Sequence, residues 1–330
     1  MRIVALEEHF TVPSLSAKIS RETLTKRGIP TSKPPAAVAR GDLLGDIGPS
    51  RIADMDANGI SVQVLSATGA GAELLPPDEA PAHARATNDI LARAVAENPG
   101  RYAGFTHLAT TNPAAAADEL ERTVTEYGFV GGMVHGTTDG KFLDDPSFEP
   151  LLSRFEALDV PLYLHPALPP ESVRRAYYDN LPGDAGFLMS MAGWGWHSET
   201  AIHVLRLVMS GALDRHPKLK LIIGHMGEGL PAMLARCDQV FADECANRLT
   251  RTVSQTITQQ VWVTTAGFFT LAPLLPLLMT FGTDRILFSI DYPFSSNAKG
   301  KAFMDALPLS PEDRIKIAHG NADRLLKLKT

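Results

Sequence analysis

Five carboxylate or imidazole residues stand at or near the ends of short apolar runs in this sequence. They are Glu7, His9, His165, His225 and Asp291. Short apolar runs that stop at polar residues are typical of buried strands, and the strands of a parallel barrel end together at one mouth. Carboxylate with imidazole suits zinc, manganese or iron better than calcium. The pattern therefore predicts a metal site at such a mouth.

The spacing of the first two candidates supports this prediction. Glu7 and His9 are two residues apart, and on a strand this spacing places both side chains on one face. The inward face of a barrel strand points into the pocket near the strand's carboxyl end. Glu8 is then expected to point into the helix layer or a neighbouring loop.

Each candidate also has an ordinary structural explanation. Glu7 and His9 could form a polar strand end, and His165 could be a buried histidine with satisfied hydrogen bonds. His225 could cap the glycine-lined turn in which it stands, and Asp291 could be the N-cap of the next helix. Several separate strands that each end in a ligand-type residue are hard to explain in this way, so the joint pattern favours the metal site.

Composition narrows the class of protein. The chain has 330 residues, 45% of them hydrophobic, and a net charge of −6, which argues against a nucleic-acid partner. Cys237 and Cys245 form no disulfide framework, so we expect a reducing, cytoplasmic setting. No signal peptide is indicated. The most apolar stretch, 271–281, contains two prolines and is too short to span a bilayer, so we expect no membrane partner.

Strand-like runs alternate with helical patterns along the chain. This alternation predicts a (β/α)₈ barrel, and we expect one domain over 1–330. A doubly wound sheet is the alternative, disfavoured because no glycine-rich phosphate fingerprint follows the first strand. The expected strands are 2–7, 61–65, 102–108, 130–134, 161–164, 219–223, 261–264 and 285–290. The expected helices are 49–58, 83–97, 113–126, 147–158, 198–210, 229–242, 271–280, 299–306 and 311–326.

Two segments are too long for simple barrel connections. Residues 10–48 and 166–197 both follow strands that end in ligand candidates. Long connections in compact domains are usually lids or binding loops. We therefore expect both segments to lie over the mouth.

With these residues the sequence resembles the amidohydrolase superfamily, in the branch of aminocarboxymuconate-semialdehyde decarboxylase and the non-oxidative aromatic acid decarboxylases. Within that branch it looks most like the γ-resorcylate (2,6-dihydroxybenzoate) and 2,3-dihydroxybenzoate decarboxylases. The Glu-x-His opening is the most specific mark, because the wider superfamily usually opens His-x-His. The resembling stretches reach from the first strand to the last: 5–10, 128–131, 159–166, 199–207, 224–231 and 285–294.

The resemblance implies one divalent ion, zinc or manganese with magnesium possible, held by Glu7, His9, His165 and Asp291. It implies a catalytic group of Asp291, His225 and Glu228. Substrate contacts are expected from Arg236, His135 and Phe294. Three positions depart from the family pattern, and all lie near the expected substrate: His135 in place of asparagine, an apolar 265–269, and serines at 295 and 296.

The implied reaction is decarboxylation of a hydroxybenzoate-type acid. The metal would chelate the phenolate and carboxylate oxygens, and Asp291 would protonate the ring carbon with His225 beside it. Arg236 would stabilise the negative charge of the substrate. Alternatives are a hydrolase of a lactone or amide, a hydratase, and a non-catalytic scaffold. The resemblance also suggests a homodimer or homotetramer.

Overall fold

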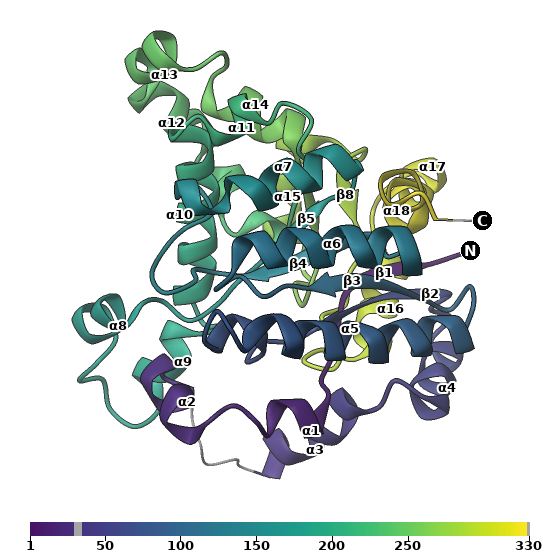
Figure 1. Ribbon diagram of the computed structural model, residues 1–330. Coiled ribbons are helices and arrows are strands. Elements are labelled where there is room, and N and C mark those ends of the chain that lie inside the picture. The colour runs from purple at the N-terminus through teal and green to yellow at the C-terminus, as the bar shows by residue number, and fades with distance from the viewer. Residues whose placement is uncertain (30–34, 329–330) are drawn as a thin grey trace.

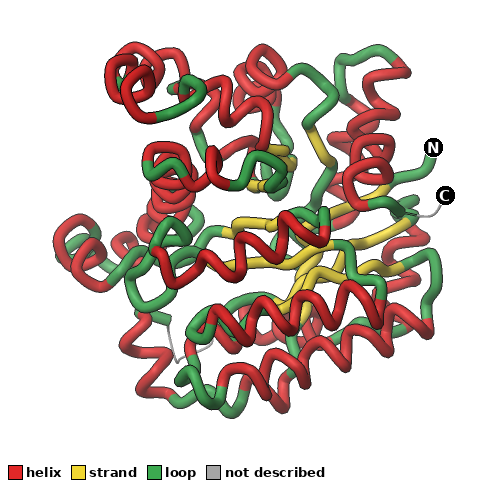
Figure 2. The backbone as a smooth tube through the Cα atoms, turned by 45° about the horizontal axis from the view of Figure 1, so that its top comes forward, coloured by secondary structure: helices red, strands yellow, loops and turns green. Residues whose placement is uncertain are grey.

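Eight parallel strands form the centre of the molecule, and each pairs with the next in chain order. The computed structural model describes residues 1–29 and 35–328. A bridge between Leu6 and Ser289 joins the last strand to the first, so the sheet is a nearly closed barrel surrounded by helices (Figures 1 and 2). The strands are β1 Val4–Phe10, β2 Val62–Ala67, β3 Tyr102–His107, β4 Gly131–His135, β5 Leu162–His165, β6 Leu221–Ile223, β7 Val261–Thr264 and β8 Ile286–Leu287.

Each predicted strand overlaps an observed one, and the predicted (β/α)₈ barrel is confirmed. The helices of the first half of the chain are α1 Pro13–Ser16, α2 Arg21–Arg27, α3 Pro35–Gly45, α4 Pro49–Ala57, α5 Ala80–Glu97, α6 Pro113–Tyr127, α7 Glu149–Leu158, α8 Glu171–Tyr177 and α9 Ala185–Ser190. Those of the second half are α10 Gly195–Met209, α11 Ala212–Arg215, α12 Leu234–Val240, α13 Ala242–Arg248, α14 Val253–Gln260, α15 Leu271–Phe281, α16 Asn297–Ala306, α17 Pro311–Ile315 and α18 Asn321–Leu326.

Local sequence signals set many of these boundaries. Asn112 caps α6 by accepting a hydrogen bond from the Ala115 N–H, and Gly128 ends the same helix with φ 69°, as left-handed C-caps require. The helix predicted over 229–242 is wrong as a single element. Gly229, with φ 80°, and Pro231 form a separate short turn before α12 begins.

Strand alternation divides the core into two layers. Val64, Phe105 and Tyr163 belong to the cluster inside the barrel, whereas their neighbours Leu65 and Leu164 pack against the outer helices. Because side chains alternate along a strand, the position two residues after inward-facing Tyr163 also points inward at the mouth. That position is His165.

The two long segments do contribute to the mouth. Residues 10–48 contain α1, α2 and α3, and 166–197 contain α8 and α9. In Figure 1, α2, α8 and α9 lie on the side of the barrel away from both termini. Within the described ranges, no helix is both long enough and apolar enough to cross a bilayer.

Candidate metal centre

Glu7 occupies an unusual backbone position in β1. Its φ is 59°, and the pairing of β1 with β2 shifts register between Ala5 and Glu8. The strand is therefore bulged here. Glu7 and His9 do share one site, but through this bulge rather than through the regular alternation expected from their spacing. Both side chains are fully buried.

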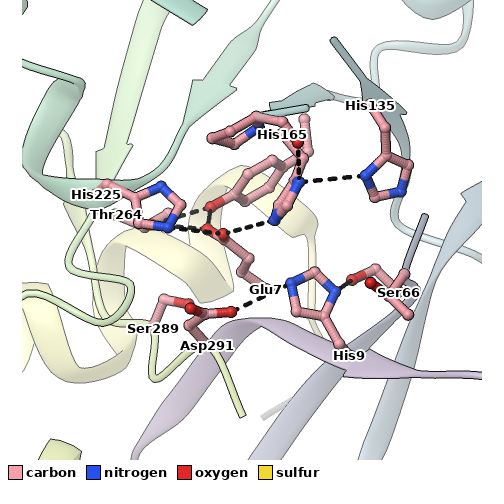
Figure 3. A network of polar contacts seen from close by, with 12 residues as sticks. Glu7, His9, Ser66, His135, His165, His225, Thr264, Ser289 and Asp291 are labelled. Carbon is pink, nitrogen blue, oxygen red and sulfur yellow. Dashed lines mark hydrogen bonds and ion pairs between the residues drawn. The ribbon is translucent and has the colours of Figure 1, made fainter. Parts of the chain in front are cut away.

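Four ligand-type side chains meet at the barrel mouth (Figure 3). His165 Nε2 lies 3.2 Å from Glu7 Oε1, and His9 Nε2 lies 3.4 Å from Asp291 Oδ1. One ligand atom each from Glu7, His9 and His165 falls within 4.8 Å of the other two. Side chains from three separate parts of the chain, β1, β5 and the segment after β8, thus converge on one point.

Two of these atoms suit a cation. Glu7 Oε1 and His9 Nε2 are buried, and neither has a hydrogen-bond partner among the described residues. Buried polar atoms without partners are costly. A divalent ion held by two imidazoles and two carboxylates would satisfy both atoms, and this donor set suits zinc or manganese. Glu7, His9, His165 and Asp291 therefore fit a metal site.

The other polar atoms of Glu7, His9 and His165 are already hydrogen-bonded. Tyr163 Oη donates to Glu7 Oε2, and the Ser66 hydroxyl lies 3.2 Å from His9 Nδ1. His165 Nδ1 lies 2.7 Å from the Pro166 carbonyl. Such outer contacts fix the orientation and tautomer of metal-binding histidines, and here they leave Nε2 of both imidazoles facing the site.

His135 makes one of these outer contacts. Its Nδ1 lies 3.2 Å from His165 Nδ1, and its Nε2 lies 3.0 Å from the Ala67 carbonyl. Burial and the neighbouring His165 lower the pKa of His135 to about 3, so the imidazole is neutral at pH 7. His135 therefore both contacts the His165 imidazole and lines the pocket.

Electrostatic interactions shift the pKa values of Glu7 and Asp291 in opposite directions. Burial acts to raise the pKa of Glu7, but the imidazoles around it, His225 foremost, hold that pKa at about 2. Burial, reinforced by the charge of Glu7, raises the pKa of Asp291 to about 7. Two nearby carboxylates with well-separated pKa values are typical of acid–base sites.

Asp291 is held by Glu8, the residue between Glu7 and His9. The Glu8 carboxylate accepts hydrogen bonds from the N–H groups of Ile290 at 2.9 Å and Tyr292 at 3.2 Å, on either side of Asp291. Glu8 thus points into a neighbouring loop. The sequence had predicted either this direction or the helix layer. This anchoring role was not predicted from the sequence.

His225 and Glu228 form a pair at the turn that follows β6, where η3 (His225–Gly227) is a single short 3-10 turn. His225 Nδ1 lies 2.8 Å from Glu228 Oε1, and His225 Nε2 lies 3.6 Å from Glu7 Oε1. Burial acts to lower the pKa of His225, but the Glu228 and Glu7 carboxylates raise it to about 10. The two carboxylates thus favour the protonated form of His225.

A pocket of about 460 Å³ opens above these groups. Phe294, Phe187 and Trp196 are its aromatic walls, and Arg27 and Arg40 bring positive charge to it. The Arg40 guanidinium lies 5.5 Å from the centre of the Phe294 ring. The pocket therefore suits a flat, negatively charged molecule.

The predicted site residues differ in whether they reach the wall of this pocket. His135, His165, His225, Asp291 and Phe294 all line this pocket. Arg236 is not among the lining residues that the structure describes; it is exposed on α12 and donates to Gln239. Its role toward substrate stays a prediction. Tyr163 was missed, although its place two residues before His165 is a signal that could have identified it.

Comparisons with known proteins agree with this geometry. The amidohydrolase family profile matches residues 29–328. The chain is 38% identical over 340 residues to the γ-resorcylate decarboxylase of Rhodococcus jostii (strain RHA1), covering 98% of each protein.

Two solved structures are similar along the whole chain. One is 2,6-dihydroxybenzoate decarboxylase complexed with 2,6-dihydroxybenzoate, with a TM-score of 0.88 and 35% identity over 99% of this chain and 100% of that one. The other is dihydroxybenzoic acid decarboxylase from Polaromonas sp. JS666 with bound manganese and the inhibitor 2-nitroresorcinol, with a TM-score of 0.87 and 35% identity over 99% and 97%.

Proposed function

The chain belongs to the amidohydrolase family, and from this premise we propose that it is a metal-dependent decarboxylase of hydroxybenzoates. The observation that carries the proposal is the convergence of Glu7, His9, His165 and Asp291 at the base of an aromatic pocket. The full-length relatives support it, since they are named as decarboxylases of dihydroxybenzoates.

Glu7, His9, His165 and Asp291 would hold the ion, which we propose to be manganese or zinc, with magnesium possible. Manganese is bound in one similar structure. When bound, such an ion would supply Lewis-acid polarisation and would help to orient the acidic substrate.

The chain's own residues would provide binding and proton transfer. Phe294 and Trp196 flank the ring, and Arg40 attracts its negative charge. Asp291, which lines the base of the pocket, is the proposed donor of the proton that reaches the ring carbon bearing the carboxylate. The carbon–carbon bond then breaks, its electron pair returns to the ring, and carbon dioxide leaves. The His225 cation stabilises the phenolic oxygen as charge develops.

We also propose that 1–330 act as one domain and assemble as a homodimer or homotetramer in the cytoplasm. Large apolar side chains on α15 support the assembly, since Leu275 is 57% and Met279 89% exposed.

The buried free thiols of Cys237 and Cys245 are consistent with a reducing compartment. Light scattering on the purified protein measures the assembly directly.

A screen tests the proposed reaction. Protein of measured metal content is incubated with a series of hydroxybenzoic acids and, separately, with lactones. Release of carbon dioxide from an ortho-hydroxybenzoate is expected. Hydrolysis of a lactone without decarboxylation of any acid would replace this proposal with a hydrolase.

A further inference from the structure

His197, at the start of α10, makes a close contact with the catalytic turn. Its Nδ1 lies 2.5 Å from Glu228 Oε2, while the other oxygen of the same carboxylate lies 2.8 Å from His225 Nδ1. One buried carboxylate therefore bridges two imidazoles. The His225 imidazole in turn faces Glu7 at the base of the pocket.

The rest of the His197 ring is also held in place. Its Nε2 lies 3.2 Å from Trp196 Nε1 and 3.1 Å from the Ala192 carbonyl. The ring centre is 4.7 Å from that of His225 and 5.5 Å from that of Phe268, in edge-to-face packing. Both ring nitrogens thus have polar neighbours, and two other rings pack against the imidazole.

These three residues are also close enough together to resemble a second metal site. The hydrogen bonds argue against that interpretation, because the Nδ1 atoms of His197 and His225 each already face an oxygen of Glu228. A carboxylate between two N–H donors is a satisfied network. The cluster is therefore a chain of hydrogen bonds that ends at His225.

The backbone of the catalytic turn adds a reason for such support. His225, Met226 and Glu228 have φ values of 51°, 55° and 56°, a backbone conformation that residues other than glycine rarely adopt. Strained turns persist at functional sites only when surrounding contacts hold them. The bond from His197 is one such contact, and it comes from a different part of the chain.

His197 belongs to the segment 166–197, which covers the pocket. Met191, Ala192 and Trp196 line the pocket immediately before His197. We propose that His197 is a positioning residue that fixes Glu228, and through it His225, so that the catalytic imidazole is aligned only when 166–197 lies over the pocket. The proposal rests on the proposed function and deepens it by linking pocket closure to the acid–base group.

The test uses two substitutions of His197 and one matched control. His197→Leu removes both ring nitrogens, whereas His197→Asn keeps a donor at the δ position. Thr200→Val is the control, because Thr200 is buried on the same helix and donates to the Trp196 carbonyl at 2.9 Å without reaching Glu228. We expect His197→Leu to lower kcat by about 10- to 100-fold, His197→Asn to recover most of it, and Thr200→Val to stay within about twofold.

A double-mutant comparison shows whether His197 acts through Glu228. If it does, His197→Leu lowers kcat in the native background but adds little to Glu228→Ala. Independent, multiplying losses in the double variant would overturn the proposal, as would full activity of His197→Leu.

Hydrogen exchange provides a readout that needs no turnover. Amides of 190–197 should exchange faster in both His197→Leu and Glu228→Ala than in Thr200→Val, because each substitution breaks the same contact. Unchanged exchange in Glu228→Ala would refute the link between turn and segment. If the variants show this exchange pattern but the wild-type protein has no decarboxylase activity, the proposed function is wrong while the His197–Glu228 contact stands.

Discussion

Replacing Tyr163 by phenylalanine should weaken metal binding without touching a ligand. Tyr163 is fully buried inside the barrel, and its hydroxyl donates to Glu7 Oε2. The substitution leaves that oxygen only the Thr264 hydroxyl, at 3.4 Å. The carboxylate that must present Oε1 to the ion is then poorly held.

The size of the effect follows from the kind of hydrogen bond that is lost. A bond to a charged acceptor contributes about 1.5–3 kcal/mol, and losing an outer partner of a metal ligand typically costs about 10- to 100-fold in affinity. These ranges agree, since a factor of ten is about 1.4 kcal/mol. The dissociation constant for manganese should therefore rise by about 10- to 100-fold in Tyr163→Phe.

Titration with manganese, followed by the paramagnetic resonance signal of the free ion, measures this constant directly. Tyr102→Phe is the matched control, because Tyr102 is also a buried barrel tyrosine but its hydroxyl has no hydrogen-bond partner in the part of the chain that the structure describes. Tyr102→Phe should bind manganese as the native protein does. If Tyr163→Phe binds manganese within about twofold of the native protein, the assignment of Glu7 as an oriented ligand is wrong.

Three further predictions follow. Asp291→Asn should lower kcat by at least about 10²-fold, the size of a lost acid–base group; near-native kcat with metal bound would exclude Asp291 as the acid. Arg40→Ala should raise KM for an anionic substrate by about tenfold with little change in kcat, and an unchanged KM would remove Arg40 from substrate binding. Burial lowers the pKa of His203 to about 3, so the folded chain keeps this imidazole neutral while the unfolded chain protonates it below 6.5. The free energy of unfolding is therefore highest above pH 6.5 and falls as pH drops toward 3, by up to roughly 1.4 kcal/mol per pH unit. In urea unfolding of His203→Leu, the free energy of unfolding should change less steeply with pH, by this amount. An identical slope would contradict the assignment.

The strand order and the position of His165 at the end of β5 could be predicted from the sequence because both follow short-range rules. The four apolar residues before His165 identify β5, and strand alternation then places Tyr163 and His165 on the same inward face. The capping pair of Thr252 and Gln255 at the start of α14 was an equally local signal. That helix was missed although the signal was present.

Other features depend on contacts that no local rule contains. The bulge that turns Glu7 into the site arises from the pairing of β1 with β2. Glu8 reaches Ile290 across 282 positions of sequence, and His197 meets Glu228 from another segment. These contacts exist only once the barrel has closed, so spacing alone does not reveal them.

The central claim is that one divalent ion, held by Glu7, His9, His165 and Asp291, supports decarboxylation of an aromatic acid. The most direct measurement follows 2,6-dihydroxybenzoate labelled in its carboxyl carbon, with native, metal-stripped and manganese-reloaded protein. We expect one labelled carbon dioxide and one resorcinol per substrate consumed, lost on stripping and restored by about one equivalent of manganese. Label release that continues undiminished in the stripped protein would contradict the account, and so would the absence of carbon dioxide from every hydroxybenzoate offered to the reloaded protein.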